Sequence, residues 1–191
     1  MREFVRVNAE GEIDAGTLPD NWDTWALDFE GTGALVYAKD YKPRLCQVSC
    51  DGKHAFIFNA QLPRHVSYIR FLVKHASQLI VHGASYDLPV LAHCFGIPLE
   101  VTWPKTTCTM EMARLLYPTE SAALKELARK ELNAEVDSDK ELRAEFKRLK
   151  LRPIANGYAT VPLDNEVFLK YAGLDAIYTF NLWMKWEERF E

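Results

Sequence analysis

Short apolar stretches separated by turn residues occupy the chain between its weakly patterned start and Pro63. The stretches are TWALDFE, ALVYA, RLCQVSC and HAFIFNA, at residues 24–30, 34–38, 44–50 and 54–60. Each contains β-branched or aromatic residues, and the segments GTG, KDYKP and DGK divide them. This pattern predicts an antiparallel meander of strands. Residues 1–21 alternate weakly around Gly11 and Gly16, which predicts a small peripheral hairpin or arm.

Beyond Pro63 the chain changes to an alternation of helical and strand patterns. Apolar residues recur at helical spacing after Pro63, and the run QLIVHGA predicts a buried strand. A second helix should end at Gly96. The remaining expected elements are a short strand near 106–109, helices around 110–117 and 121–132, a charged segment over 135–152 and a long amphipathic helix over 165–189. Strands followed by alternating helix and strand predict an α/β domain with a mixed sheet.

Composition and charge indicate a single intracellular domain. The 191 residues are 48% hydrophobic, which is ample for one core. The formal net charge of -4 gives no global electrostatic reason to bind nucleic acid or an anionic membrane. The four cysteines show no CxxC spacing, and no stretch approaches the ~20 apolar residues of a membrane span. We therefore expect a soluble, cytoplasmic protein with reduced cysteines and no membrane association.

Two acids one residue apart end the first stretch of the meander. Asp28 and Glu30 precede the segment GTG, and residues two apart on a strand project from the same face. Like charges that close raise each other's pKa unless a cation lies between them. Carboxylate oxygens suit Mg2+ or Mn2+. The pair is therefore either part of a divalent metal site or two acids at a solvent-facing strand end.

Further acids follow a later strand and lie on the last helix. Asp87, in HGASYD, falls in the first turn of a predicted helix, where the helix dipole alone would also favour an acid. Tyr171 and Asp175, in YAGLD, are four apart and share one helix face, as they would in an ordinary amphipathic helix. Each acid has a structural explanation by itself, but their order and surroundings favour one shared site.

These segments, in this order, resemble the three motifs of the DEDD superfamily of 3′-to-5′ exonucleases. The likeness is to the subgroup whose third motif carries tyrosine, and it covers about residues 22–190. It is strongest to the proofreading exonuclease of bacterial and phage DNA polymerase I proteins. The resemblance implies a ribonuclease H-like α/β fold, with a mixed five-stranded sheet flanked by helices. It divides the chain into an arm or hairpin at 1–21 and a single exonuclease domain at 22–191.

The same resemblance implies a two-metal cleavage of phosphodiesters with two Mg2+ or Mn2+ ions per site. Asp28, Glu30, Asp87 and Asp175 would be the catalytic and metal-binding acids, with Asp87 in a supporting position. Tyr171 would complete the catalytic set by orienting the attacking water.

Positions around the motifs are expected to contact substrate. The expected contacts are Gly31, Thr32, His82, Tyr86, Lys147 and Arg148. Gly31 and Ala34 are smaller than the threonine and the wedging leucine that the family commonly carries, which predicts a loose grip on the 3′ terminus. We expect His82 to be a structural or substrate-contacting residue rather than a metal ligand. The stretch KELRAEFKRLKLR, which includes Lys147 and Arg148, either guides the strand or forms a solvated helix face.

Three functions remain open from the sequence. The favoured one is removal of nucleoside 5′-monophosphates from the 3′ end of single-stranded or frayed DNA, with a separately encoded DNA polymerase as the candidate partner. The rival is a ribonuclease D-like trimming of RNA 3′ ends. The third is a catalytically inactive module that binds nucleic acid, although all four acids and the tyrosine are present.

Overall fold

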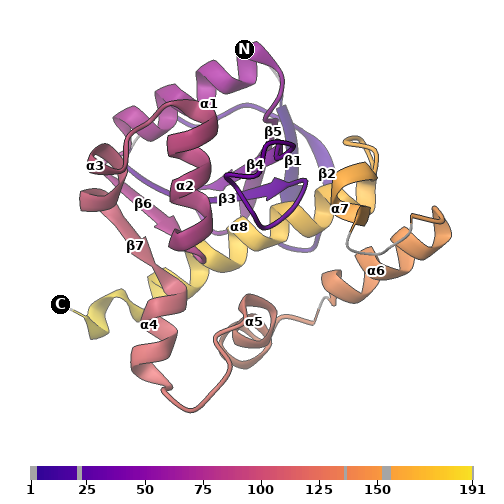
Figure 1. The fold of residues 1–191 in the computed structure, drawn as a ribbon. Helices are drawn as coiled ribbons and strands as arrows, with labels where there is room; N and C mark the ends of the chain where they lie inside the picture. The colour runs from indigo at the N-terminus through magenta and orange to yellow at the C-terminus, as the bar shows by residue number, and fades with distance from the viewer. Residues whose placement is uncertain (1–3, 21–22, 136, 152–155, 191) are drawn as a thin grey trace.

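A mixed sheet with helices on both faces forms the centre of the molecule (Figure 1). The computed structural model describes residues 4–20, 23–135, 137–151 and 156–190. The strands are β1 Phe4–Asn8, β2 Ile13–Gly16, β3 Thr24–Gly31, β4 Pro43–Ser49, β5 His54–Asn59, β6 Gln78–Val81 and β7 Thr106–Cys108. Their order across the sheet is β2-β1-β5-β4-β3-β6-β7. The pairs β3–β6 and β6–β7 are parallel, whereas the other neighbours are antiparallel.

The sheet has seven strands in the described residues, where the resemblance to DEDD exonucleases implied five. The strands β5, β4, β3, β6 and β7 form one continuous part of the sheet, and the hairpin of β1 and β2 extends it beyond β5. The hairpin joins through β1, which pairs with β5 from Val5 to Asn8. The prediction that β3, β4 and β5 form an antiparallel meander is confirmed.

The prediction of a strand at residues 34–38 was wrong, because this segment is a loop between β3 and β4. Leu35 and Tyr37 are 77% and 67% exposed, so no strand covers them, while Val36 alone turns inward. The loop is closed at its base where the backbone N–H of Thr32 donates to the carbonyl of Lys42 at 3.0 Å. A β-branched and aromatic composition favours a strand only where a neighbouring strand is available.

The helices fall into two groups, one on each face of the sheet. They are α1 Pro63–His75, α2 Ala84–Phe95, α3 Leu99–Thr102, α4 Thr109–Leu116, α5 Leu124–Leu132, α6 Ser138–Arg148, α7 Gly157–Thr160 and α8 Glu166–Trp186, with short 3-10 turns η1 Trp103–Lys105 and η3 Glu187–Arg189. Helices α1 and α2 pack with β3, β4 and β5 in one core. Helix α8 lies across the other face, and α4, α5 and α6 pack against it (Figure 1).

The ends of the helices that lead to the site follow local sequence signals. Helix α2 ends at Gly96 as predicted, where the residue has φ 64°, a left-handed conformation that glycine adopts without strain. Helix α8 begins after Asn165, whose side-chain oxygen accepts a 3.0 Å hydrogen bond from the backbone N–H of Phe168. None of the described helices combines the length and apolarity needed to cross a membrane.

Candidate active site

The alternation of side chains along β3 places the two acids of the first motif on one face of the sheet. Trp25, Leu27 and Phe29 are at most 3% exposed and lie in the core under α1 and α2. Asp28 and Glu30 occupy the alternate positions, so they face the layer that contains α8. The strand β3 pairs with β6 over its first residues and with β4 along both acids, so Asp28 and Glu30 are held in the sheet by β4.

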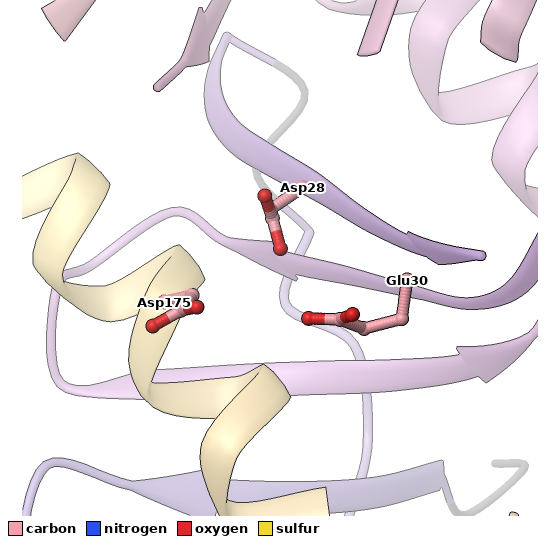
Figure 2. Close-up of side chains that lie close together, drawn as sticks. All are labelled: Asp28, Glu30 and Asp175. Atoms are coloured by element: carbon pink, nitrogen blue, oxygen red, sulfur yellow. The ribbon is translucent and has the colours of Figure 1, made fainter. Parts of the chain in front are cut away.

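Asp175 reaches the same space from α8. Figure 2 shows the carboxylates of Asp28, Glu30 and Asp175 pointing toward one another, two from β3 and one from the helix. One oxygen of each lies within 4.8 Å of the others. Gly173 permits this approach of α8, because a Cβ at this position would lie 2.6 Å from the Cβ of Val7 on β1. The structure thus brings together three of the four acids predicted to bind metal, and we call these three the acid cluster.

The electrostatics of the acid cluster favour a bound cation. Burial raises the pKa of Asp28 to about 6, although a hydrogen bond from Gln47 and the charge of Lys125 act in the opposite direction. Burial, followed by the charge of Asp28, raises the pKa of Glu30 well above its usual value. A divalent cation between such carboxylates removes their repulsion. Three closely spaced carboxylates also match the oxygen ligands that Mg2+ and Mn2+ prefer, so this donor set fits the predicted metals.

Asp87 lies beside the acid cluster. It occupies the first turn of α2 and is 1% exposed. Its Oδ1 accepts a 3.2 Å hydrogen bond from the backbone N–H of Phe29, the residue between the two acids of β3. Burial, and then the charge of Asp28, raise the pKa of Asp87 well above its usual value. Asp87 therefore braces β3 from the opposite face while remaining close enough to interact with the charges of the cluster.

Tyr171 opens onto a cavity next to the acid cluster. The cavity has a volume of about 320 Å³ and is lined by Phe29, Glu30, Gly31, Gly33, Ala34, Tyr86, Tyr158 and Tyr171. Tyr171 lies one helical turn before Asp175, so both side chains share a face of α8. Burial, and then the charge of Glu30, raise the pKa of Tyr171, so that its hydroxyl keeps its proton at neutral pH. This hydroxyl can donate a hydrogen bond to a water or to a phosphate oxygen.

Lys125, which sequence reasoning did not single out, carries a positive charge to the cluster. Its Nζ, from the first turn of α5, forms an ion pair with Oδ1 of Asp175. The same atom lies 4.3 Å from the centroid of the Tyr171 ring. Burial lowers the pKa of Lys125 to about 8, while the charges of Asp28 and Glu30 act in the opposite direction. Lys130 belongs to the same helix and looks no different from Lys125 in the sequence. Only the fold shows which of the two lysines reaches the acid cluster.

Two further polar residues of β4 support the site and were also missed. Gln47 lies opposite Asp28 in the strand register, and its Nε2 donates to Oδ2 of Asp28. The Oε1 atom of Gln47 is buried and has no hydrogen-bond partner among the described residues. Arg44 donates to the backbone carbonyls of Tyr158 and Val161, which fixes Tyr158 in the cavity wall. Only the register of β3 and β4, which sequence alone does not give, would have identified Gln47.

Gly31 and Tyr86, two of the predicted substrate contacts, both line the cavity. A Cβ at position 31 would lie 2.5 Å from Oη of Tyr41 and 2.6 Å from Oη of Tyr86. These two hydroxyls are hydrogen-bonded to each other at 2.9 Å. The two tyrosine hydroxyls therefore fill the space that a larger side chain at position 31 would occupy, so the glycine leaves no void there. Thr32 is in the same loop, where its Oγ1 accepts a 2.9 Å hydrogen bond from the backbone N–H of Lys42.

His82 is bound by protein groups through both ring nitrogens. Its Nδ1 lies 2.9 Å from Oγ1 of Thr109, and its Nε2 lies 2.9 Å from the carbonyl oxygen of Ala122. Burial lowers the pKa of His82 to about 4, so the ring is neutral at physiological pH. With Nε2 donating to the carbonyl, Nδ1 is the acceptor for the Thr109 hydroxyl. Of the two roles expected for His82, this geometry favours the structural one, which joins β6, α4 and the segment before α5.

The basic segment contains the helix α6, in which several charges are paired. Arg148 forms two hydrogen bonds of 2.6 and 2.7 Å with the carboxylate of Glu145. That carboxylate also accepts a 2.7 Å hydrogen bond from Asn165 at the start of α8. Lys147 is exposed. Both side chains are therefore exposed, but Arg148 is paired with Glu145, whose carboxylate also joins α6 to the start of α8. Arg152, at the end of the segment, lies outside the described residues.

Comparison with known families identifies the class of protein that this fold and site define. Residues 16–191 match the model of the 3′-5′ exonuclease family, so the chain belongs to that family. The predicted resemblance to DEDD exonucleases is confirmed, and the fold is ribonuclease H-like, as predicted.

Individual relatives show which kinds of protein the chain resembles. The chain is 29% identical over 162 residues to the DNA polymerases of Mycobacterium phages L5 and D29, a match that covers 81% of the chain and 27% of each polymerase. Among solved structures, Brucella melitensis NrnC with bound Mg2+ is 25% identical, with a TM-score of 0.63 over 91% of this chain and 78% of NrnC. NrnC bound to pGG is 24% identical, with a TM-score of 0.63 over 91% and 79% of the two chains.

Proposed function

We propose that this chain is a divalent-metal-dependent 3′-5′ exonuclease of the subgroup with tyrosine in its third motif. In this proposal it hydrolyses the terminal phosphodiester bond of single-stranded or frayed DNA and releases nucleoside 5′-monophosphates. The observation that carries the proposal is the acid cluster, with oxygens within 4.8 Å of one another, beside a cavity into which Tyr171 opens. Membership of the 3′-5′ exonuclease family supports the reaction, and the likeness to phage DNA polymerases favours DNA.

The position of each residue in the site indicates its role in the proposed reaction. Asp28, Glu30 and Asp175 would hold the metal, with Asp87 supporting the site from α2. Bound divalent cations supply Lewis-acid stabilisation of negative charge and activation of water. The cavity would receive the 3′-terminal nucleotide, whose scissile phosphate would then lie at the acid cluster. Tyr171 would donate a hydrogen bond that orients the attacking water or a phosphate oxygen.

The other residues predicted to contact substrate divide into two kinds in this proposal. Gly31 and Tyr86 lie in the cavity wall, where Tyr86 and Tyr158 can present aromatic surface to a base or sugar. Thr32 and His82 would shape the site through their bonds to the protein. Lys147, exposed at the end of α6, would attract the phosphate backbone in a salt-sensitive manner, and Arg148 would contribute less because Glu145 pairs with it.

Degradation of short oligonucleotides, including RNA, is a second candidate. NrnC in complex with pGG shares the fold over 91% of this chain. The cavity of about 320 Å³ would receive the terminal nucleotide of a short oligonucleotide in the same way as that of a longer strand. A ribonuclease D-like trimming of RNA would use the same acids.

A separately encoded DNA polymerase remains the proposed partner for the DNA reaction, by analogy with the phage polymerases that contain a related segment.

One experiment separates these functions. The protein is incubated with 3′-tailed DNA, RNA of matched sequence or pGG, in Mg2+, Mn2+ or EDTA, and the products are resolved by length. We expect stepwise shortening of DNA that EDTA abolishes. Faster cleavage of pGG or RNA would favour the second candidate, whereas binding of all three without cleavage would indicate an inactive module.

Variants assign the activity to this site. Asp28→Ala should remove detectable cleavage, and Tyr171→Phe should lower kcat by about a hundredfold while leaving the fold intact. Glu100→Ala is a matched control, because this exposed acid belongs to α3. If Asp28→Ala cleaves as fast as the parent, the activity comes from elsewhere and the proposal fails.

A further inference from the structure

Lys125 occupies a position that the exonuclease reaction as proposed above does not use. Its side chain is 16% exposed and that of Asp175 is 9% exposed, so this is not a surface ion pair. Removing one partner of a buried ion pair leaves an uncompensated charge, so such pairs hold their partners firmly in place. Asp175 is also a member of the acid cluster. A fixed ammonium therefore lies directly beside the space in which a metal would bind.

The ammonium of Lys125 contacts one stripe of α8. It lies 4.3 Å from the ring centroid of Tyr171 and 5.5 Å from that of Tyr178, in addition to its pairing with Asp175. Residues 171, 175 and 178 follow one another on one face of the helix. A cation over a tyrosine ring is attracted to the ring, more strongly when water is excluded. One side chain from α5 thus touches both the tyrosine and the acid of the third motif.

We propose that Lys125 is a positioning residue, a tethered cation that holds Asp175 and Tyr171 in place in the metal-free chain and that a divalent metal displaces from Asp175. The inference rests on the proposed function, because it requires the acid cluster to bind metal. The physical reason is competition, since the ammonium and the metal are like charges that require the same carboxylate. Lys125 would prevent the buried acids from repelling one another before metal arrives. It would also lower the affinity of the site for the metal.

The first test is a calorimetric titration with Mn2+ of the parent, Lys125→Met and Lys130→Met. Lys130 is a matched control because it also belongs to α5, pairs with Glu120 at 2.6 Å and lies 3.7 Å from the centroid of the Tyr117 ring, away from the acid cluster. We expect Lys125→Met to bind Mn2+ tighter by about tenfold or more, because a competing charge is gone. Its melting temperature without metal should be lower than that of the parent. Lys130→Met should bind Mn2+ like the parent.

The second test uses the parent protein and does not depend on the folding of a variant. Lysines are labelled by reductive methylation in EDTA or in Mn2+, and the modified peptides are quantified by mass spectrometry. Lys125 should be protected without metal and should become at least several-fold more reactive when Mn2+ displaces it, while Lys130, 42% exposed in its side chain, reacts equally in both.

The outcomes distinguish this inference from the proposed function. If the parent does not bind Mn2+, the metal site itself fails and the role of Lys125 fails with it. If the parent binds Mn2+ but Lys125→Met binds with equal or lower affinity, or if Lys125 stays protected in saturating Mn2+, the displacement is wrong while the metal site stands.

Discussion

Single residues of the first motif are fixed by side chains from distant parts of the chain. Gly31 meets the hydroxyl groups of Tyr41 and Tyr86, which bond to each other and belong to different elements of the site. Asp28 is held by Gln47 of the neighbouring strand. These contacts constrain the residue type at Gly31, which lines the cavity, and at Asp28, which belongs to the acid cluster. The glycine and the tyrosine pair therefore form one structural unit.

A methyl group at position 31 should destabilise the protein. The Cβ of Gly31→Ala would require the two tyrosine hydroxyls to move, and overpacking of this kind costs about 1–3 kcal/mol. Chemical denaturation should show a lower midpoint for this variant than for the parent. Gly33→Ala is the matched control in the same loop, because a Cβ there meets no atom within 4 Å. Equal loss of stability in both variants would show that the loop backbone, and not the tyrosine pair, requires glycine.

Helix α8 is the element that brings the third motif to the sheet. It contacts β1, β3, β4 and β5, and Gly173 sets how closely it can approach β1. Its start is fixed by Asn165, which caps the helix and also donates to Glu145 of α6. The depth of α8 on the sheet therefore determines the distance of Asp175 from the two acids of β3.

Filling the contact between α8 and β1 should move Asp175 away from the cluster. Gly173→Ala would place its Cβ 2.6 Å from the Cβ of Val7, so we expect a loss of about 1–3 kcal/mol in the free energy of unfolding and weaker Mn2+ binding. Val7→Gly removes this Cβ together with both methyl groups, and the double variant should recover part of both losses. Denaturation and Mn2+ titration of the four proteins give the coupling energy. Additive effects would mean that Gly173 does not act through Val7.

Elements with strong local signals could be predicted from the sequence, whereas docked side chains could not. Gly96 ends α2 through a left-handed conformation that glycine favours, and the spacing of Asp28 and Glu30 fixes their shared face. Residues 34–38 have the composition of a strand but lie in a loop, where no neighbouring strand pairs with them. The local pattern therefore predicted the wrong structure for this segment. Lys125 and Gln47 depend on how α5 and α8 dock and on the register of β3 and β4, which the sequence does not encode locally.

At the scale of the whole molecule, the acid cluster makes stability depend on pH and on metal. The folded chain without metal raises the pKa of Asp28 to about 6, and raises those of Glu30 and Asp87 as well, mainly through burial. A carboxyl whose pKa is higher in the folded state contributes stability below its unfolded pKa. That contribution is lost as the pH rises through the folded value. His82 acts in the opposite direction over part of this range, because folding lowers its pKa to about 4.

A comparison of two proteins isolates the contribution of Asp28. The free energy of unfolding is measured in EDTA between pH 5 and pH 7.5 for the parent and for Asp28→Asn, so that the effect of His82 cancels. The parent should lose stability relative to Asp28→Asn as the pH rises, because only the parent must ionise a carboxyl at position 28 within the cluster. Saturating Mn2+ should stabilise the parent more at pH 7.5 than at pH 5, since ionised carboxylates bind the ion. A difference between the two proteins that does not change with pH would mean that Asp28 titrates normally, and the repulsion within the cluster would then be too weak to require a cation.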